Sequence, residues 1–377
     1  MIYLDNAATT LKKPPAVARA MVRALQTCAN PGRGGHEAAM RAQEVVYRTR
    51  EAAAELFDCE PEQVCFTANA TEGLNAAIGS LIGAEDSVLI SGVEHNAVTR
   101  TLFGSGAEIT IAAPEDRNDL FSKDAWIQAF ELGLEKPVSA VICSHVGNVL
   151  GCVLPVEEIA GLCRRKEVPL LVDASQSAGV LPVSLRSWGA AFIAMPGHKG
   201  LYGPQGTGLL LCGMKPRVFR YGGTGSASAE QAMPDELPDR MEAGTLNVPG
   251  ISGLGAGLAF VKQQGVYGIG EWERRLIRRA EEGLRDAGFD TITGPDQAGV
   301  LSFLDPGQDP EDTAAWFSRH GAALRAGLHC APLAHQTAGT FPQGTVRLSV
   351  SGLTQPWEID RFLELARRLK DTQKRSR

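Results

Sequence analysis

The stretch Leu170-Leu171-Val172-Asp173-Ala174-Ser175-Gln176 begins as a run of apolar residues and then reaches a carboxylate. An apolar run of this kind is typical of a strand that is covered on both faces, as in the parallel sheet of an α/β protein. An Asp at the end of such a strand lies at the carboxyl edge of the sheet, where open α/β folds bind their ligands. The alternative on this stretch alone is that Asp173 caps a following helix.

Short apolar runs alternate with helical patterns on both sides of this strand. The expected strands are Val64–Thr67, Ser87–Ser91, Ala107–Ala112, Val138–Ser144, Val168–Asp173, Ala191–Met195 and Gly206–Cys212. The expected helices are Glu37–Phe57, Thr71–Leu81, Ala125–Leu132 and Val156–Lys166. This alternation predicts an α/β fold with a mostly parallel sheet.

The character of the chain changes after Cys212, where a polar, Gly-rich stretch at Tyr221–Pro238 predicts a long loop. The expected elements that follow are helices at Gly250–Phe260, Glu271–Ala287, Glu311–Arg319 and Pro356–Leu369, and strands at Val300–Leu304 and Val346–Val350. We therefore expect a large domain at 15–245 and a smaller α+β domain formed by 1–14 and 246–377. The basic tail Lys370–Arg377 is expected to be frayed.

The composition excludes several classes of protein. The 377 residues carry 37 basic and 43 acidic side chains, for a net charge of −6, so a nucleic-acid-binding surface is not expected. No apolar run reaches the ~18 residues of a membrane-spanning helix, and the N-terminus has no signal-peptide pattern. The eight cysteines are widely spread without metal-binding spacing, which predicts free thiols, a cytoplasmic location and no metal site.

A lysine follows the next expected strand, in Met195-Pro196-Gly197-His198-Lys199-Gly200. Burial at a strand end lowers the pKa of a lysine toward that of a usable nucleophile or base, although a solvated lysine in a turn fits the same pattern. A Lys that forms a Schiff base and an Asp that pairs with a pyridinium nitrogen are the signature of pyridoxal phosphate. The turn Phe66–Gly73 could bind the phosphate at a helix start, or Thr71 could simply cap that helix.

Nine motifs in order extend this pattern over nearly the whole chain: Tyr3–Thr10, Asn30–His36, the turn at Thr71, Glu94–Asn96, His145–Gly151, the strand at Asp173, Gly197–Lys199, Glu242–Thr245 and Arg325–Leu333. With these motifs the chain resembles the class V aminotransferase-type enzymes of fold type I, which depend on pyridoxal phosphate. Within them it is most similar to the second group of cysteine desulfurases and selenocysteine lyases.

The resemblance implies a role for each matching residue. The implied catalytic residues are Lys199, His95 and Cys330. The implied cofactor-binding residues are Ala70, Thr71, His95, Asn148, Asp173, Gln176, His198, Lys199 and Thr245, the last reaching the cofactor of the neighbouring subunit in a homodimer. The implied substrate-binding residues are Asn6, Arg325 and Arg347. Without the resemblance, Arg347 could be a charge on an exposed strand face. Pro196 stands where many relatives have a phosphate-binding Ser, so one phosphate donor is missing.

Cys330 distinguishes among the possible reactions, because its polar surroundings, with His329 and Arg325, favour a nucleophilic thiolate. The implied reaction converts L-cysteine to L-alanine and leaves a persulfide on Cys330 for a sulfur-acceptor protein. The alternatives are selenocysteine lyase acting on L-selenocysteine, a true class V aminotransferase, and a non-catalytic sulfur-carrier scaffold.

Overall fold

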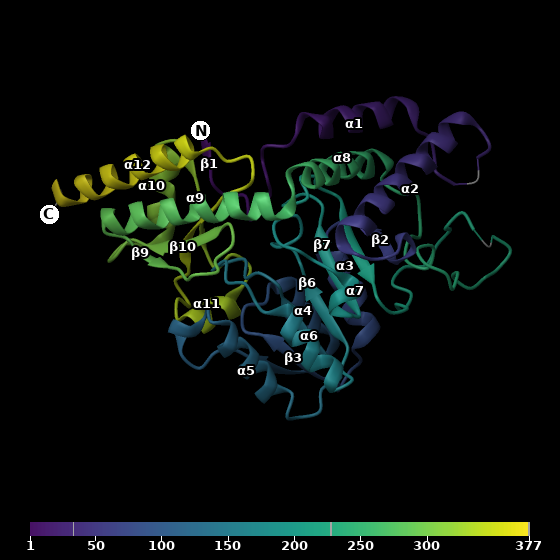
Figure 1. The fold of residues 1–377 in the computed structure, drawn as a ribbon, viewed down its shortest axis with the longest axis horizontal. Helices are drawn as coiled ribbons and strands as arrows, with labels where there is room; N and C mark the ends of the chain where they lie inside the picture. Colours follow the sequence, from purple (N-terminus) through teal and green to yellow (C-terminus); the bar gives the residue numbers. More distant parts are fainter. Residues whose placement is uncertain (33, 227, 376–377) are drawn as a thin grey trace.

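The computed structural model describes residues 1–32, 34–226 and 228–375 (Figure 1). Arg33, within the motif Asn30–His36, lies outside the described residues. The chain folds around one large sheet, a four-stranded sheet and a two-stranded sheet.

The large sheet has seven strands in the order β2-β8-β7-β6-β5-β3-β4. Its strands are β2 (Val64–Thr67), β3 (Ser87–Ser91), β4 (Glu108–Ala112), β5 (Ala140–Ser144), β6 (Leu170–Asp173), β7 (Phe192–Pro196) and β8 (Gly208–Cys212). Only β8 among them runs against its neighbours, so the prediction of a mostly parallel sheet is confirmed. The carboxyl ends of β3, β5, β6 and β7 therefore meet at one edge.

Helices cover both faces of this sheet. They are α2 (Glu37–Phe57), α3 (Ala70–Leu81), α4 (Asn96–Ser105), α5 (Lys123–Gly133), α6 (Val156–Arg165) and α7 (Leu185–Trp188). Alternate residues of β6 enter different cores: Leu171 packs with the cluster under α3 and α4, and Val172 packs with the cluster under α5 and α6. Both faces are buried, which explains the unbroken apolar run in the sequence.

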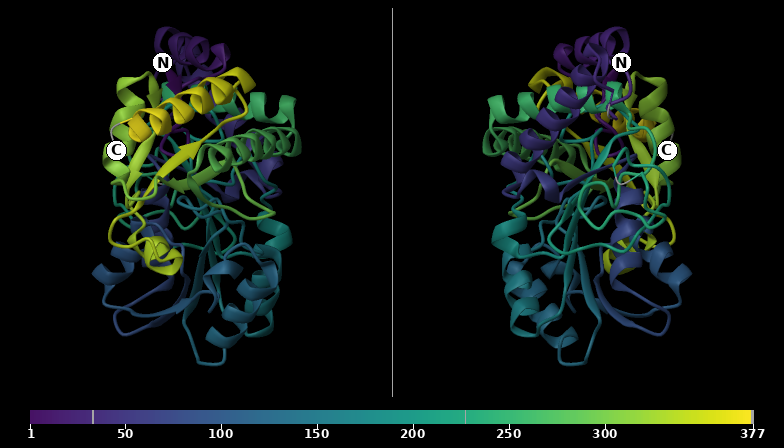
Figure 2. Two further views of the ribbon diagram at one scale, coloured as in Figure 1. Left: turned by 90° about the vertical axis from the view of Figure 1, so that its left-hand side faces the viewer. Right: turned by 90° about the vertical axis from the view of Figure 1, so that its right-hand side faces the viewer.

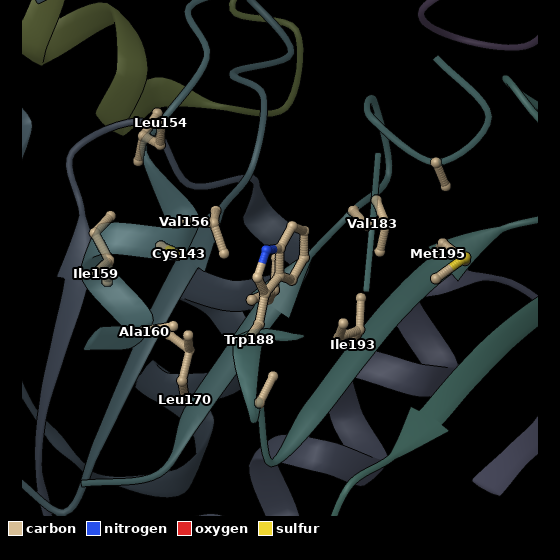
Figure 3. Close-up of a cluster of buried hydrophobic side chains, with 14 of the residues drawn as sticks. Cys143, Leu154, Val156, Ile159, Ala160, Leu170, Val183, Trp188, Ile193 and Met195 are labelled. Atoms are coloured by element: carbon tan, nitrogen blue, oxygen red, sulfur yellow. The ribbon is translucent and has the colours of Figure 1, made fainter. Parts of the chain in front are cut away.

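The second of these clusters is centred on Trp188, at the end of α7. Figure 3 shows its indole ring lying between Val156 on one side and Val183 and Ile193 on the other. The edge of the His145 ring meets this indole at a centroid distance of 5.1 Å. The aromatic packing thereby supports the loop that follows β5.

Two further helices form the opposite end of the molecule from α5. They are α1 (Pro15–Thr27) and α8 (Val248–Gln264), which pack on each other and on α2 (Figures 1 and 2). Close packing explains the Gly-x-Gly-x-Gly run in α8: a Cβ at Gly257 would lie 2.2 Å from the Leu201 carbonyl oxygen. The domain boundary at residue 245 stays a prediction. Helix α8 follows this boundary in the sequence but packs on α1 and α2, which belong to the expected large domain.

The C-terminal third forms an antiparallel sheet with helices, in agreement with the predicted α+β unit. Its strands are β9 (Asp290–Ile292), β10 (Val300–Leu304), β12 (Arg325–Gly327) and β13 (Thr345–Ser349), in the order β12-β13-β10-β9. Its helices are α9 (Val266–Ala287), α10 (Pro310–Arg319), α11 (Pro332–Ala338) and α12 (Pro356–Arg375). The N-terminal strand β1 (Ile2–Tyr3) joins this unit by pairing with β11 (Ala322–Ala323).

The prediction of a frayed C-terminal tail is wrong for 370–375, because α12 continues to Arg375. Lys370 forms an ion pair with the buried carboxylate of Asp305 and lies 4.2 Å from the centroid of the Phe289 ring. Gln373 donates to the same carboxylate at 2.7 Å. Tertiary contacts thus hold a polar segment in helical form, and residues 376–377 lie outside the description.

The described helices include none that is both long and apolar enough to cross a membrane. All eight cysteines are free, and only Cys330 among them is exposed.

Candidate active site

A cavity of about 210 Å³ lies at the carboxyl edge of the large sheet, against the C-terminal unit. It brings together ten of the residues that the sequence predicted: Ala70, Thr71, His95, Asn148, Asp173, Gln176, His198, Lys199, Arg325 and Arg347. These residues come from both parts of the chain, so the site exists only where the two units meet.

Lys199 enters the cavity from the turn that follows β7. Burial lowers the pKa of its amino group to about 8; the positive charges of Arg347 and Arg325 act in the same direction, and Asp173 opposes them. The amino group makes no hydrogen bond or ion pair with any of the described residues. Its backbone carbonyl, by contrast, is fixed by the Thr10 hydroxyl at 3.2 Å and the Tyr202 N–H at 2.9 Å. A well-held, unpartnered amine of low pKa is suited to covalent chemistry.

Asp173 lies at the end of β6, as predicted, and lines the same cavity. One of its oxygens accepts the Ser175 N–H at 2.8 Å, so it also holds the local turn. Beneath it is Glu94, whose pKa burial raises to about 8; the nearby Asp173 raises it too, while hydrogen bonds from Ser91 and Ser144 oppose the shift. The raised pKa favours the neutral form of Glu94 close to the Asp173 carboxylate.

One end of the cavity is lined by the start of α3. The helix is capped by Asn69, whose side-chain oxygen accepts the Glu72 N–H at 2.9 Å, so the alternative that Thr71 is the cap is wrong. Thr71 is instead the second helical residue, and with Ala70 it lines the cavity. The unpaired N–H groups of a first helical turn attract an anion there.

His95 and Asn148 lie on two neighbouring loops over the sheet edge. The Nδ1 atom of His95 accepts the Ala97 N–H at 3.0 Å, which fixes the ring as the cap of α4. Burial, as the largest effect, lowers the pKa of His95. The Asn148 amide donates to the His329 carbonyl at 2.9 Å, but its own side-chain oxygen is buried without a partner. That oxygen is available to a bound group.

Arg347 is 1% exposed, which excludes the alternative of a charge on an exposed strand face. One terminal nitrogen pairs with the Asp5 carboxylate at 2.8 Å and the other donates to the Asn148 carbonyl at 3.0 Å. Its Nε atom is buried without a partner. Because an unsatisfied buried donor is costly, this nitrogen favours an anionic ligand.

Cys330 lies beside the cavity and is exposed. Its sulfur is 3.8 Å from a terminal nitrogen of Arg325, and both Arg325 and the adjacent residue His329 line the cavity. Cys330 has a left-handed backbone with φ of 56°. The thiol is therefore placed at the entrance, beside a cation.

The family model described as Aminotransferase class-V matches residues 2–362. The chain belongs to this family. Its relatives include a probable cysteine desulfurase of Pyrococcus abyssi, 31% identical, with the alignment covering 99% of this chain and 96% of the relative. Among solved structures, an apo cysteine desulfurase from Thermococcus onnurineus matches with a TM-score of 0.89 and 30% identity over 98% of this chain and 95% of that one. The cysteine desulfurase CsdA from Escherichia coli matches with a TM-score of 0.84 and 25% identity, over 98% and 95%.

Enzymes of the class-V aminotransferase family depend on pyridoxal phosphate, and the residues of this cavity fit that group. Lys199 offers an unpartnered amine for the aldehyde, and Asp173 offers a carboxylate for the pyridinium nitrogen. The unpaired oxygen of Asn148 and the free N–H groups at Thr71 provide polar contacts at the ring and the phosphate. Pro196 also lines the cavity, and it has neither a hydroxyl nor an N–H to donate. That the phosphate therefore has one hydrogen-bond donor fewer than in many relatives stays a prediction.

Besides Cys330, two predicted site residues, Asn6 and Thr245, lie outside this cavity. The amide of Asn6 donates to the Ser349 carbonyl at 3.0 Å, and the residue lines a much smaller cavity behind Lys199. Thr245 lies beyond β2, in hollows lined by Glu242 and Leu246. Asn6 therefore ties the N-terminal segment to β13, and its role in substrate binding stays a prediction.

Two charged residues that shape the site, Asp5 and Glu94, have no role predicted from the sequence. Asp5 pairs with Arg347, and Glu94 underlies Asp173. Both stand inside the quoted motifs, so their positions were visible, but their partners are distant in sequence. No local pattern joins Asp5 to a residue more than 340 positions away.

Proposed function

We propose that this chain is a pyridoxal-phosphate-dependent cysteine desulfurase, acting on L-cysteine and passing sulfur to an acceptor protein. The observation that best supports this function is the position of the exposed Cys330 thiol. Its sulfur lies 3.8 Å from the Arg325 guanidinium, beside a cavity that is lined by Lys199, Asp173 and Arg347. The relatives named as cysteine desulfurases over nearly the full chain support the same activity.

The substrate carboxylate is held by Arg347. Its guanidinium is a planar fork suited to a carboxylate, and its buried Nε still lacks a partner. Asp5 occupies one terminal nitrogen, which fixes the orientation of the fork. Bound pyridoxal phosphate supplies an electron sink for the substrate Cα.

Side chains of the protein, Lys199 and Cys330, carry out the removal of the Cα proton and the transfer of sulfur. Lys199, neutral above its lowered pKa of about 8, takes the Cα proton on Nζ. The Cys330 thiolate attacks the substrate sulfur: a sulfur–sulfur bond forms, the carbon–sulfur bond breaks, and its electron pair passes to carbon. That carbon, the substrate Cβ, then takes up a proton, and Lys199 returns a proton from Nζ to Cα, which completes L-alanine. Cys330 carries the persulfide.

The test is one turnover of the purified, cofactor-loaded protein with L-cysteine. We expect one L-alanine for each active site and a Cys330-containing peptide heavier by one sulfur atom, detected by mass spectrometry. Accumulation of the amine form of the cofactor would instead identify an aminotransferase. Turnover of L-selenocysteine alone would identify a selenocysteine lyase, and failure to retain any cofactor would identify a scaffold.

We further propose a homodimer in which Thr245 reaches the cofactor phosphate of the neighbouring subunit. In support, Thr245 borders an open hollow of about 650 Å³ between α2 and the loop after β8, away from its own chain's cavity. The exposed Tyr47 on α2 lines the same hollow and would be covered by a second subunit.

Sedimentation should therefore give twice the mass of one chain. Thr245→Ala should weaken cofactor retention by about 3- to 10-fold, the usual effect of one hydrogen bond, without changing the mass. A monomer that retains the cofactor fully would contradict the proposal.

We also propose a reducing, cytoplasmic location for this activity. The eight free cysteines and the need to keep Cys330 as a thiol support it.

A further inference from the structure

The turn that carries Cys330 has an unusual backbone. His329 and Cys330 are consecutive non-glycine residues with positive φ, of 53° and 56°. Side chains other than glycine adopt this left-handed conformation only where the surrounding structure compensates for its strain. The position of the thiol therefore depends on what holds this turn.

The backbone of the turn is held from outside by the loops of the large sheet. The Asn148 amide donates to the His329 carbonyl at 2.9 Å, and the Asn96 N–H donates to the Cys330 carbonyl at 2.7 Å. These contacts fix two carbonyl groups, but neither reaches the other side of the turn, where α11 begins.

A chain of side-chain hydrogen bonds holds that other side. His329 Nε2 lies 3.3 Å from the Arg325 carbonyl, and His329 Nδ1 lies 3.3 Å from His335 Nε2. His335 Nδ1 lies 2.7 Å from the Thr340 hydroxyl. These hydrogen bonds thus connect β12, through His329 and His335 of α11, to Thr340, the second residue after α11.

When both rings are neutral, these atoms allow only one arrangement of protons. The Arg325 carbonyl can only accept, so His329 must carry its proton on Nε2, and its Nδ1 must accept. His335 must then donate from Nε2 and accept on Nδ1, and the Thr340 hydroxyl must donate. Both rings are neutral in this arrangement, and every ring nitrogen has a partner.

Burial keeps the rings neutral. His335 is fully buried and His329 is 4% exposed. Desolvation lowers the pKa of His335 to about 4, and it lowers the pKa of His329 further, with the charge of Arg347 acting in the same direction. These hydrogen bonds therefore stay formed at pH values near 7. They act as a fixed support for the turn and release no proton.

We infer that His335 and Thr340 are positioning residues for the Cys330 thiol, acting through His329 and the Arg325 carbonyl. The chain joins residue 325, whose guanidinium contacts the sulfur at 3.8 Å, to the left-handed pair that carries the sulfur. When these side-chain hydrogen bonds are removed, the turn keeps its contacts to Asn148 and Asn96 but loses its side-chain link to β12. The importance of the thiol rests on the proposed function, but the placement of the thiol can be measured without substrate.

Thr340→Val is the sharpest variant, because it removes the hydroxyl and keeps the shape of the side chain. Its matched control is Thr340→Ser, which keeps the hydroxyl. His335→Gln can still donate toward His329, whereas His335→Leu cannot. The first measurement is the alkylation rate of Cys330 in the resting holoenzyme at fixed pH, read by mass spectrometry of its peptide. The second is the rate of persulfide formation with L-cysteine, together with KM.

We expect Thr340→Val and His335→Leu to slow both reactions of Cys330 by about 3- to 10-fold, because the thiolate loses its fixed cation. KM for L-cysteine and the visible absorbance of the bound cofactor should stay unchanged, and Thr340→Ser and His335→Gln should restore most of both rates. Unchanged alkylation and persulfide rates in Thr340→Val would overturn the inference. Equal slowing in Thr340→Ser would overturn it as well, since the hydroxyl would then not matter.

The nitrogen NMR signals of the two histidines give an independent check, because they distinguish a ring that is neutral with its proton on Nε2 from other states. A charged ring, or a neutral ring with its proton on Nδ1, at His329 or His335 at pH 7 would contradict the proposed series of hydrogen bonds. If the wild type formed no persulfide at all, the proposed function would fail, while the alkylation rates and NMR signals would still decide this inference.

Discussion

Lys199→Ala is expected to abolish turnover of L-cysteine, with a loss of at least about 100- to 10,000-fold, because the chain loses its general base and its covalent link to the cofactor. The visible absorbance of the cofactor-bound protein should disappear with it. Lys199→Arg should be nearly as inactive, since a guanidinium keeps the charge and cannot act as a neutral amine. Lys262→Ala is the matched control, because that lysine is exposed and pairs with Glu55 on the surface.

The same lysine predicts the pH dependence of cofactor attachment. Its pKa is lowered from 10.5 to about 8, so the neutral, reactive form dominates above pH 8 and the protonated form dominates below it. The rate of attachment to the apoprotein should therefore rise toward pH 8 and level off above it. Below pH 8 it should fall about tenfold for each pH unit, as followed by the visible absorbance. A rate that keeps rising to pH 10 would show that burial does not depress the pKa.

Cys330→Ala is expected to lower the release of sulfur from L-cysteine by at least about 100-fold while the cofactor absorbance is retained, because the nucleophile alone is removed. Cys59→Ser is the matched control: burial, with Asp58 and Glu60, raises the pKa of that thiol to about 12 and makes it inert. Sulfur release and persulfide formation on the purified holoenzyme are the measurements.

Comparison of two substrates sharpens this result. A selenol ionises and leaves more readily than a thiol, so cleavage of L-selenocysteine should survive in Cys330→Ala better than cleavage of L-cysteine. If Cys330→Ala released sulfur from L-cysteine at the wild-type rate, the assignment of Cys330 as the nucleophile would be wrong.

Local patterns accounted for the elements that carry the site. The strands ending at Asp173 and just before Lys199 were predicted from apolar runs, because burial on both faces leaves a continuous apolar signature. Thr71 was considered as an alternative cap of α3, although Asn69 and Glu72 have the spacing of a capping box, which was a readable signal for the true cap. Helix α4 was not predicted, since its few buried residues, such as Val98 and Leu102, form only a short stripe.

The sequence by itself determined the order of strands and helices, the strand-end chemistry at Asp173 and Lys199, and the family, because these depend on short-range periodicity and on motifs read in order. Only the tertiary structure decided that Arg347 is buried against Asp5, that Thr245 and Asn6 lie away from the cavity, and that His335 supports the turn of Cys330. Those contacts arise where the C-terminal unit packs on the large sheet. Burial and charge at that junction depend on residues hundreds of positions apart, and no local pattern encodes them.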